Sequence, residues 1–507
     1  MNVSEERTRS LWMETAEIEA PALDRDEAAD VVVVGSGIAG LSTAYELARE
    51  GQSVVVLDRG PIGRGMTART TAHLASTSDD SYDALIKTHG LDSARLHYES
   101  QAAAIDRIEA TQREEGIDCD FQRVDGFLFA GSEQDRGQLE RERDASQQAG
   151  LSVEWAERAP FTGLDSGRCL RFARQARVHP VKYLNGLIDC IRRNSGRLYG
   201  ETTVAEVQEN NGGVEVSTTG PHKVRARAAV FATNSPINDR VAIHSKQAPY
   251  RTYVVAGPVP RDSVVDALYW DTQDPYHYVR LQPGNKDGDD TLIIGGEDHR
   301  SGEADDGESR FHALEDWARR HFPALKDVAF RWSGQVLQPV DYVAFIGRNH
   351  GNRNVYVATG DSGQGITNGA LAGMLLSQLI LKGDSRWAAL YDPARGAQRA
   401  IGEYVRENVP VIKNFAEYLT GGELESLDAL QPEQGAVVRR GLKKIAAYRD
   451  DKGKLHLRSA VCTHLGCIVH WNSLERCWDC PCHGSQFAID GTALNGPAIS
   501  PLPEAQL

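Results

Sequence analysis

The clearest pattern of apolar and polar positions lies near the amino terminus and predicts a strand, a helix and a second strand in succession. Residues 31–34 are four consecutive valines, a β-branched run typical of a parallel strand covered on both faces. A glycine-rich turn at 35–40 leads into a helical pattern over 41–50. A second apolar run at 53–57 predicts the next strand, which ends at Asp58.

A second strand-to-helix pattern lies much later in the chain. Residues 354–358 predict another buried strand, which runs into a glycine-rich turn at 360–369 and a long apolar helix at 370–381. Between the two patterns, roughly over 85–350, helix-like and strand-like stretches alternate. Residues 383–435 lose strong periodicity and predict a connecting segment that is partly helical.

Length and charge limit the possible classes of protein. At about 150 residues per domain, 507 residues suggest about three globular units. The net charge of −15 argues against a general nucleic-acid binder, and no apolar run approaches the roughly 18 residues of a membrane span. The first thirty residues lack the pattern of a secretory signal. We therefore expect a soluble cytoplasmic protein with no nucleic-acid partner and no membrane span.

The cysteines are concentrated near the carboxyl end. Five of the eight lie within 21 residues, between Cys462 and Cys482. Crowding of this kind in a cytosolic chain indicates metal or redox chemistry. Residues 437–507 carry nine Lys or Arg and six Asp or Glu, a net charge of +3, against −18 for residues 1–436. A large acidic body thus precedes a small, slightly basic, cysteine-rich module.

The turn at 35–40 has its glycines at the spacing of a dinucleotide-binding loop. Gly35 allows the tight turn, Gly37 lets the backbone approach a pyrophosphate, and Gly40 lets the helix pack on the strand. Asp58, 23 residues beyond Gly35, is placed to accept hydrogen bonds from a ribose. A turn that merely needs glycine flexibility is the alternative. The residues expected to bind the nucleotide are Gly35, Ser36, Gly37, Ile38, Ala39, Gly40 and Asp58.

The loop alone does not distinguish FAD from NAD, but the second glycine-rich turn favours FAD. A helix N-terminus here could face the N1–C2=O edge of an isoalloxazine ring and stabilise the anionic reduced flavin. An ordinary strand-to-helix turn is the alternative. The residues concerned are Gly360, Asp361, Gly363, Gln364 and Gly365.

The chain carries these two glycine-rich motifs and a third motif after a strand, Ala232-Thr233-Asn234. With them, residues 29–395 resemble the FAD-dependent oxidoreductases of the D-amino-acid oxidase (glycine/sarcosine oxidase) superfamily. The resemblance implies a Rossmann-type FAD domain interleaved with an antiparallel-sheet substrate domain, and oxidation of an amine or amino acid. The chain offers one GxGxxG motif, which disfavours a nicotinamide donor. Further residues expected near FAD are Arg59, Arg69, Thr70, Thr71, Val204, Thr233 and Asn234.

Two cysteine–histidine motifs near the carboxyl end have the form CxH-x15-CxxH. They are CTHLGC at 462–467 and CPCHGS at 480–485. Two thiolates and two imidazoles suit a Rieske 2Fe-2S centre or a tetrahedral zinc site, but zinc sites usually show CxxC and HxxxH spacing. The motifs resemble the Rieske fold over residues 435–507. The resemblance implies that the cluster ligands are Cys462, His464, Cys480 and His483.

The same resemblance assigns roles to neighbouring residues. Cys467 and Cys482 match the disulfide of respiratory-type Rieske proteins, and Ser485 matches the hydroxyl that hydrogen-bonds a cluster sulfur. Phe487 stands where the respiratory proteins have a tyrosine, so we expect a reduction potential below theirs and above that of oxygenase-type clusters. Cys477 belongs to neither motif and is expected to be a buried small apolar residue.

The expected fold class is α/β plus β, ending in an all-β Rieske domain. The expected segments are an extension at 1–28, FAD-binding parts at 29–84, 176–240 and 350–395, substrate parts at 85–175 and 241–349, a linker at 396–434 and the Rieske domain at 435–507.

Candidate catalytic groups lie in the expected substrate domain. An arginine there could pair with a substrate carboxylate, and tyrosines could form the wall of an amine site; half-buried packing is the alternative. The candidates are Tyr250, Arg251, Tyr253, Tyr276, Tyr278 and Arg280. His179, before Pro180, is expected to be structural.

The leading hypothesis is an oxidoreductase acting on CH–NH or CH–NH2 donors. A small-molecule amine or amino acid would reduce FAD, which would pass single electrons to the Rieske cluster and to an unidentified external acceptor. Two alternatives stay open: a reductase in which electrons flow from cluster to flavin, and a redox sensor that turns over no substrate.

Overall fold

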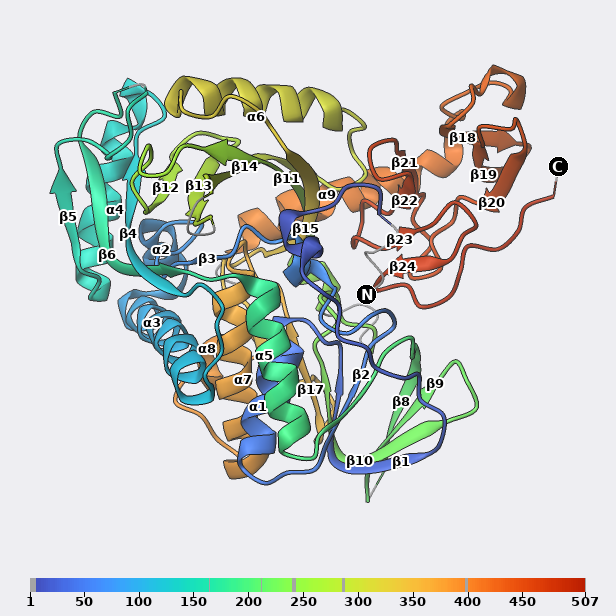
Figure 1. The fold of residues 1–507 in the computed structure, drawn as a ribbon. Helices are drawn as coiled ribbons and strands as arrows, with labels where there is room; N and C mark the ends of the chain where they lie inside the picture. The colour runs from blue at the N-terminus through green and yellow to red at the C-terminus, as the bar shows by residue number, and fades with distance from the viewer. Residues whose placement is uncertain are drawn as a thin grey trace.

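The computed structural model describes residues 6–163, 165–210, 212–238, 243–284, 288–396 and 400–506. Within these residues two large sheets form the body of the molecule, and two small sheets form a carboxyl-terminal domain beside it (Figure 1). Among the described helices, none is both long enough and apolar enough to cross a bilayer. The cytoplasmic location stays a prediction.

The first sheet of the body has the strand order β16-β17-β10-β1-β2-β7. All neighbouring strands on this path run parallel except β16 and β17. Helices α1, α5 and α7 gather on one side of the sheet, and the hairpin β8–β9 extends from β10 on the other (Figure 1). The strands are β1 (Glu27–Val34), β2 (Val54–Leu57), β7 (Arg197–Tyr199), β8 (Val204–Asn210), β9 (Gly213–Thr218), β10 (Lys223–Phe231), β16 (Phe345–Arg348) and β17 (Val355–Thr359).

Of the helices of the body, α1, α5 and α7 pack against this sheet, whereas α4 packs against the second sheet. The unit β1-α1-β2 expected near the amino terminus is confirmed, and so is the late apolar helix, which begins five residues earlier, at Gly365. The helices are α1 (Ile38–Arg49), α2 (Tyr82–His89), α3 (Leu91–Glu115), α4 (Arg136–Ala149), α5 (Pro180–Arg193), α7 (Gly365–Lys382) and α8 (Ala388–Tyr391).

The second sheet has the order β15-β11-β14-β13-β12-β4-β6-β3, with β5 paired to β6. Most pairs are antiparallel, and helix α6 (Gly307–His321) lies across the sheet (Figure 1). The strands are β3 (His73–Leu74), β4 (Gln122–Phe129), β5 (Val153–Ala156), β6 (Cys169–Arg177), β11 (Gln247–Val259), β12 (Leu268–Asp271), β13 (His277–Gln282), β14 (Asp290–Arg300) and β15 (Phe330–Pro339).

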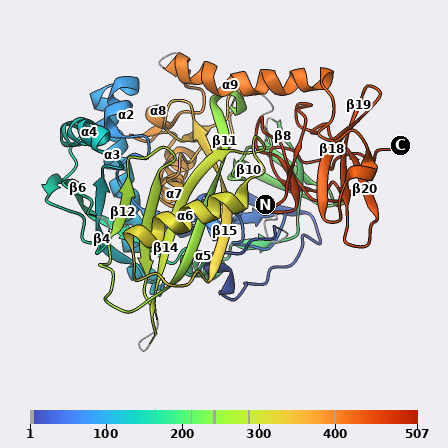
Figure 2. The same ribbon diagram turned by 90° about the horizontal axis from the view of Figure 1, so that it is seen from above.

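The carboxyl-terminal domain consists of a three-stranded and a four-stranded antiparallel sheet. The strands are β18 (Gln434–Arg440), β19 (Lys443–Arg449), β20 (Leu455–Ser459), β21 (His470–Asn472), β22 (Cys477–Asp479), β23 (Gln486–Phe487) and β24 (Ala493–Asn495). Helix α9 (Ile401–Ala416) lies along one side of the molecule and connects the body to this domain (Figure 2).

The described part of the expected amino-terminal extension packs closely against the body. The Trp12 side chain is fully buried, and its indole N–H donates to the carbonyl of Thr70 over 2.6 Å. The same ring lies edge-on to His179 at 4.7 Å and beneath the guanidinium of Arg280. His179 caps α5, with Nδ1 accepting from Lys182 N, and burial lowers its pKa to about 4. This segment therefore holds the loop that precedes β3.

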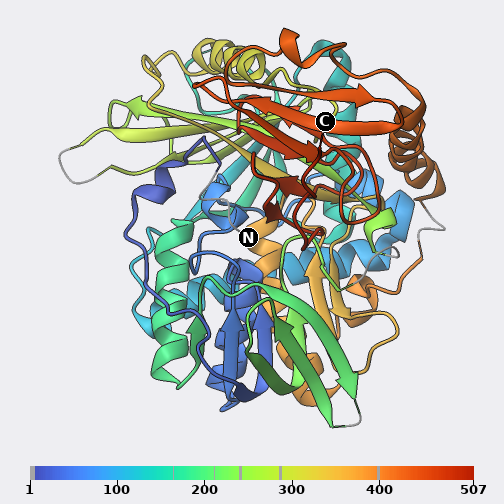
Figure 3. The same cartoon turned by 90° about the vertical axis from the view of Figure 1, so that its right-hand side faces the viewer.

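A buried network of charges joins the carboxyl-terminal domain to the body. Figure 3 shows this domain in front of the body, on the side that faces the viewer. Arg69 Nε lies 2.8 Å from the carboxylate of Glu6 and Arg69 Nη1 lies 3.5 Å from that of Glu475. Arg251 Nη2 lies 3.3 Å from the carboxylate of Asp479. All five side chains are at most 4% exposed.

The network contains two guanidinium groups and three carboxylates drawn from three parts of the chain. Burial raises the pKa of the Glu6 carboxyl. Ser333 on β15 adds neutral hydrogen bonds, since it accepts from Arg251 and donates to Glu475, each over 2.5 Å. Removing one charge from such a network leaves its partners buried and unpaired.

We predict that Arg251→Met lowers the free energy of unfolding by about 3 kcal/mol, because Asp479 and Glu475 lose their shared cation. The midpoint of chemical unfolding measures this loss. Arg225→Met is the matched control: this side chain is 61% exposed and pairs with Glu215 on the surface, so the midpoint should stay unchanged. Equal midpoints for Arg251→Met and the unchanged protein would contradict the role of the network.

Candidate functional site

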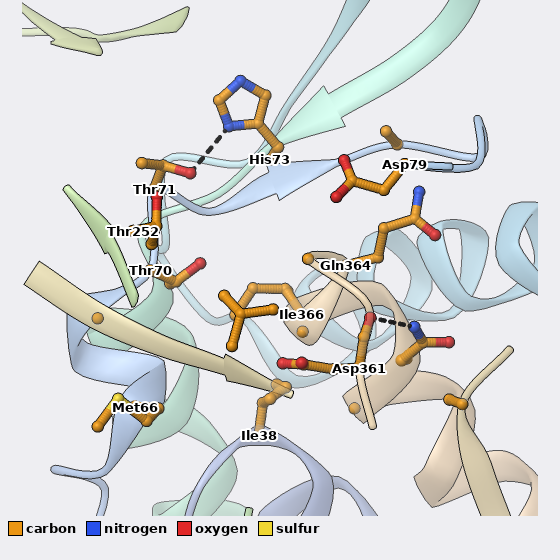
Figure 4. A pocket seen from close by; sticks show the side chains of 18 of the residues that line it. Ile38, Met66, Thr70, Thr71, His73, Asp79, Thr252, Asp361, Gln364 and Ile366 are labelled. Carbon is orange, nitrogen blue, oxygen red and sulfur yellow. Dashed lines mark hydrogen bonds between the residues drawn. The ribbon is translucent and has the colours of Figure 1, made fainter. Parts of the chain in front are cut away.

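A cavity of about 350 Å³ lies between the two sheets of the body. It runs from the glycine-rich turn after β1, past the loop that precedes β3, to the turn before α7 and the tyrosines of the second sheet. Figure 4 shows Ile38 and Met66 on one side of it and Asp79 and Gln364 on the other. Two glycine-rich turns and the second sheet therefore line one cavity.

The first glycine-rich turn brings the backbone close to its neighbours. A Cβ at Gly35 would lie 2.3 Å from the carbonyl oxygen of Ala232, and φ there is +102°. A Cβ at Gly40 would lie 1.9 Å from the carbonyl oxygen of Gly35, so only glycine lets α1 approach the turn. Gly37 lines the cavity, and a Cβ there would contact only Thr67 Oγ1, at 3.2 Å. The N-terminus of α1 is thus open to an anion such as a pyrophosphate.

Asp58 stands at the end of β2 and holds this turn in place. Its Oδ2 accepts from Ser36 N over 2.7 Å and from Ser36 Oγ over 2.6 Å. Its Oδ1 accepts from Gly60 N over 3.1 Å. The side chain also lines the cavity, so it lies where a ribose hydroxyl of a bound nucleotide would be recognised.

The second turn lies at the N-terminus of α7, where the cavity continues. Gly363 has φ +76°, and a Cβ there would lie 2.3 Å from the carboxylate of Asp79. Asp361 folds over the start of the helix, and burial raises its pKa to about 6. Asp361 Oδ1 is buried without a hydrogen-bond partner among the described residues. The turn therefore presents a helix N-terminus and an unsatisfied polar atom to a bound group.

The structure places most of the residues expected to bind the nucleotide around this cavity. Those that line it are Gly35, Ser36, Gly37, Ile38, Ala39, Asp58, Arg69, Thr70, Thr71, Thr233, Asn234, Gly360, Asp361, Gly363, Gln364 and Gly365. Gly40, Arg59 and Val204 lie outside the lining. Gly40 packs beneath the turn, Val204 packs in the core beside β10, and Arg59 donates to the carbonyl of Ala493 in the carboxyl-terminal domain.

Of the catalytic candidates, Tyr276 and Tyr278 line the cavity. Their rings lie 5.4 Å apart, and burial raises the pKa of both hydroxyls well above its usual value. Tyr276 donates to Asp79 over 3.0 Å, and the Tyr278 hydroxyl lies 2.8 Å from Thr252 Oγ1. The two tyrosines thus form a wall at one end of the cavity.

The other four candidates lie elsewhere, which corrects the expectation that they face substrate. Arg251 pairs with the carboxyl-terminal domain, because its side of β11 faces that domain. The Tyr250 hydroxyl donates to Glu407 on α9. The Tyr253 hydroxyl lies 2.9 Å from His299 Nε2, beneath α6.

Arg280, the fourth, points away from the cavity, and its guanidinium donates to the carbonyls of Ala72 and Val178.

The lining also contains residues that were not among the candidates, and three of them, His73, Asp79 and Gln335, bear on function. His73 and Asp79 follow the flavin-loop candidates at 69–71 by only a few residues. This nearness in sequence is a signal from which their position at the cavity could have been predicted. Burial and the neighbouring Arg280 lower the pKa of His73 to about 3, so this imidazole is neutral. Nothing local to Gln335 indicates its position, because that position depends on how the second sheet meets the carboxyl-terminal domain.

The two cysteine–histidine motifs form one site in the carboxyl-terminal domain. The first lies between Val461 and Ile468, which form a β-bridge, and the second connects β22 to β23. The Cys480 thiol hydrogen-bonds the Cys462 sulfur and lowers the pKa of Cys462. The rings of His464 and His483 lie 5.0 Å apart and nearly perpendicular.

The two sulfurs thus lie together and the two imidazoles lie together, which is the pairing that a Rieske 2Fe-2S cluster requires, with two Cys on one iron and two His on the other. His483 Nδ1 is buried and has no hydrogen-bond partner among the described residues, which suits a ligand nitrogen. The expected ligands thus fit the cluster. Cys477, the fifth cysteine of this region, is fully buried, and burial raises the pKa of its thiol well above its usual value.

A different set of three sulfurs, from Cys467, Cys480 and Cys482, is also close enough to hold a metal, within 4.8 Å of one another. Cys467 and Cys482, however, are joined by a disulfide. A disulfide removes both thiolates, so this set cannot act as a three-sulfur metal site.

The histidine side of the cluster site faces the body of the molecule. His244, 2% exposed and just before β11, lies edge-on to His464 at 4.8 Å and to His483 at 5.7 Å. Gln335, which lines the cavity, donates through Nε2 to the carbonyl of Gly484 over 2.8 Å. One side chain thus contacts both the cavity and the second cluster motif.

Comparisons with known families match two separate parts of the chain. Residues 30–379 match the family model described as FAD dependent oxidoreductase (DAO), and residues 423–506 match that of the Rieske [2Fe-2S] domain. The fold class and both cofactors expected from the sequence are thereby confirmed.

Two relatives and one solved structure illustrate the similarity. The protein YhfW of Bacillus subtilis (strain 168), described as a Rieske 2Fe-2S iron-sulfur protein, is 32% identical over 99% of each chain. Gamma-glutamylputrescine oxidoreductase of Escherichia coli (strain K12) is 28% identical over 75% of this chain and 90% of its own. Glycine oxidase from Geobacillus kaustophilus shares the fold, with a TM-score of 0.61 and 19% identity over 73% of this chain and 99% of that chain.

The family match covers more than half of the chain and agrees with the glycine turns, the cavity and the cysteine–histidine site. The chain therefore belongs to the DAO family of FAD-dependent oxidoreductases and carries a Rieske [2Fe-2S] domain at its carboxyl end.

Proposed function

We propose that this protein oxidises an amine or amino acid at FAD and passes the electrons, through its Rieske cluster, to an external one-electron acceptor. Bound FAD accepts a hydride, and the cluster carries one electron at a time. In the substrate the C–H bond breaks, its electron pair leaves as hydride, and the nitrogen lone pair forms a C=N bond. Two equivalents of the acceptor then take the two electrons.

The choice of an amine or amino-acid donor is supported by similarity and by the cavity. A relative that covers three quarters of this chain is named for an amine, gamma-glutamylputrescine. The walls at the substrate end carry Tyr276, Tyr278 and Thr252, which orient a ligand, and the neutral imidazole of His73. Oxidation by hydride loss needs positioning more than acid–base machinery, and these groups supply it.

The electron route rests on one observation: the histidine side of the cluster site packs against the flavin-containing body rather than facing solvent. His483 is 8% exposed, and His244 of the body lies against it. Gln335 adds a hydrogen-bonded connection from the cavity to Gly484, the residue after His483. Asn495 donates to the same Gln335 side chain over 2.8 Å and holds it in place. This arrangement supports electron exchange inside one chain.

We predict that anaerobic mixing with a true amine substrate bleaches the flavin and then reduces the cluster. Absorbance follows the flavin, and electron paramagnetic resonance follows the cluster. In Cys480→Ser, which lacks one cluster ligand, the flavin should still be bleached at an unchanged rate while the cluster signal is lost.

A cluster that stays oxidised beside fully reduced flavin would contradict the proposed route. If no amine or amino acid in a broad panel bleaches the flavin, the redox-sensor alternative gains support. If a chemically reduced cluster transfers its electrons to oxidised flavin and the reverse transfer fails, the direction of flow is opposite to that proposed.

The potential of the cluster depends on hydrogen bonds to its sulfurs. The Ser485 hydroxyl hydrogen-bonds the Cys462 sulfur and accepts from Ala498 N over 3.0 Å, which fixes its orientation. Phe487 is fully buried in the same core and has no hydroxyl to donate. At these two positions the described chain thus has one side-chain hydroxyl where the respiratory pattern implies two.

We predict that Phe487→Tyr raises the reduction potential of the cluster. One added hydrogen bond contributes about 1 kcal/mol, equivalent to about 40 mV for a one-electron couple. A redox titration followed by electron paramagnetic resonance measures the shift. Tyr448→Phe, which changes a ring that packs against Trp471 in the same domain, is the control and should leave the potential unchanged. A lower or equal potential in Phe487→Tyr would refute the assignment.

A further inference from the structure

The substrate end of the cavity has an unusual balance of charge. Five carboxylates line the described cavity: Asp58, Asp79, Glu142, Asp271 and Asp361. Three of them are occupied by protein hydrogen bonds. Asp58 accepts from Ser36, Glu142 from the backbone of Tyr82 and Asp83, and Asp271 from His277.

Asp79 is the carboxylate best placed to meet a ligand. It lines the cavity and is exposed to it, and Tyr276 donates to its Oδ2 over 3.0 Å. Gly363 leaves room for this carboxylate, since a Cβ there would clash with Oδ2. Figure 4 shows Asp79 beside Gln364, on the side of the cavity opposite Met66.

No cation among the described lining residues is placed to bind a substrate carboxylate. The lining contains one arginine and no lysine. That arginine, Arg69, directs its guanidinium into the buried pairs with Glu6 and Glu475. The lining also contains one histidine, His73, whose low pKa keeps it neutral.

The wall beside Asp79 suits an organic cation. The rings of Tyr276 and Tyr278 lie 5.4 Å apart, and His73 lies edge-on to Tyr278 at 5.5 Å. Aromatic faces attract alkylammonium groups, and a carboxylate adds a charge-assisted hydrogen bond. An α-carboxylate would instead meet carboxylates with no cation to offset them.

On the basis of the function proposed above, we propose that Asp79 recognises the ammonium group of an aliphatic amine that lacks an α-carboxylate, and that Tyr276 and Tyr278 enclose its carbon chain. Asp79 then accepts one proton from the ammonium group, which frees the nitrogen lone pair to form the C=N bond as the hydride leaves. Amines, not α-amino acids, are then the substrate class.

The electrostatics of the cavity agree with this assignment. Burial, and next the neighbouring Asp80, raise the pKa of Asp79 well above its usual value. Burial likewise raises the pKa of Asp298, close to these residues, to about 7. An ammonium group brought to this end relieves the repulsion among these carboxyls.

The test measures binding to the holoenzyme with two matched probes, n-butylamine and norvaline, which differ only by an α-carboxylate. Perturbation of the oxidised flavin spectrum under anaerobic conditions reports binding, and bleaching reports oxidation. We expect n-butylamine to bind at least ten-fold more tightly than norvaline. Norvaline binding as tightly as n-butylamine would overturn the proposal.

Asp79→Asn keeps the size of the side chain and removes its charge. We expect it to weaken n-butylamine binding at least ten-fold and to leave norvaline binding unchanged or tighter. Asp80→Asn is the matched control, because Asp80 accepts from Ser362 and Gln338 and does not line the cavity. Its effect should be less than three-fold, and equal losses in both variants would overturn the role of Asp79.

Tyr276→Phe keeps the ring and removes the hydrogen bond to Asp79, so a loss of two- to five-fold is expected even if Asp79→Asn fails to fold. No loss in this variant would count against the proposal. The experiment distinguishes failure of the proposed oxidation from failure of the amine assignment. Charge-dependent binding of n-butylamine without bleaching contradicts the proposed oxidation alone. Bleaching by norvaline that is unchanged in Asp79→Asn contradicts the amine assignment alone.

Discussion

The position of the Rieske domain depends on burying two arginines among three carboxylates. Arg69 and Arg251 belong to the body, whereas Glu475 and Asp479 belong to the Rieske domain. Separating the domains would expose these pairs or leave charges buried without partners, and either change is costly. The network therefore fixes the cluster relative to the cavity. The proposed electron exchange between the cofactors then needs no movement of one domain against the other.

The amino-terminal segment makes this arrangement a three-part assembly. Glu6 supplies a carboxylate to Arg69, and Thr8 N donates to Glu475 over 3.0 Å. A few residues later Trp12 holds the carbonyl of Thr70, in the loop that lines the cavity. The start of the chain thus contacts both the flavin loop and the Rieske domain. Nothing in its mixed, acidic composition indicates such a role, because its partners lie between 58 and 467 residues away along the chain.

The sequence predicted features that are encoded locally. The glycines of the first turn and the two cysteine–histidine motifs carry their chemistry within a few residues, so their positions could be inferred. Arg251 illustrates what could not. A strand arginine beside tyrosines suits a substrate carboxylate equally well, and only the packing of β11 against a distant domain shows that it pairs with Asp479. Asp79 is the converse case, since its neighbours Tyr276 and Gly363 come from distant parts of the chain.

The side chain that connects the cavity to the cluster motif is a neutral amide, and this choice has a physical basis. Gln335 donates to the carbonyl of Gly484 and accepts from Asn495, so one group satisfies partners of both kinds. A carboxylate at this buried position would face the carbonyl of Gly484 without a proton to donate, and an ammonium group could not accept from Asn495. A fixed charge would also shift the potentials of both cofactors at once. An amide joins the two sites while leaving each potential to its own surroundings.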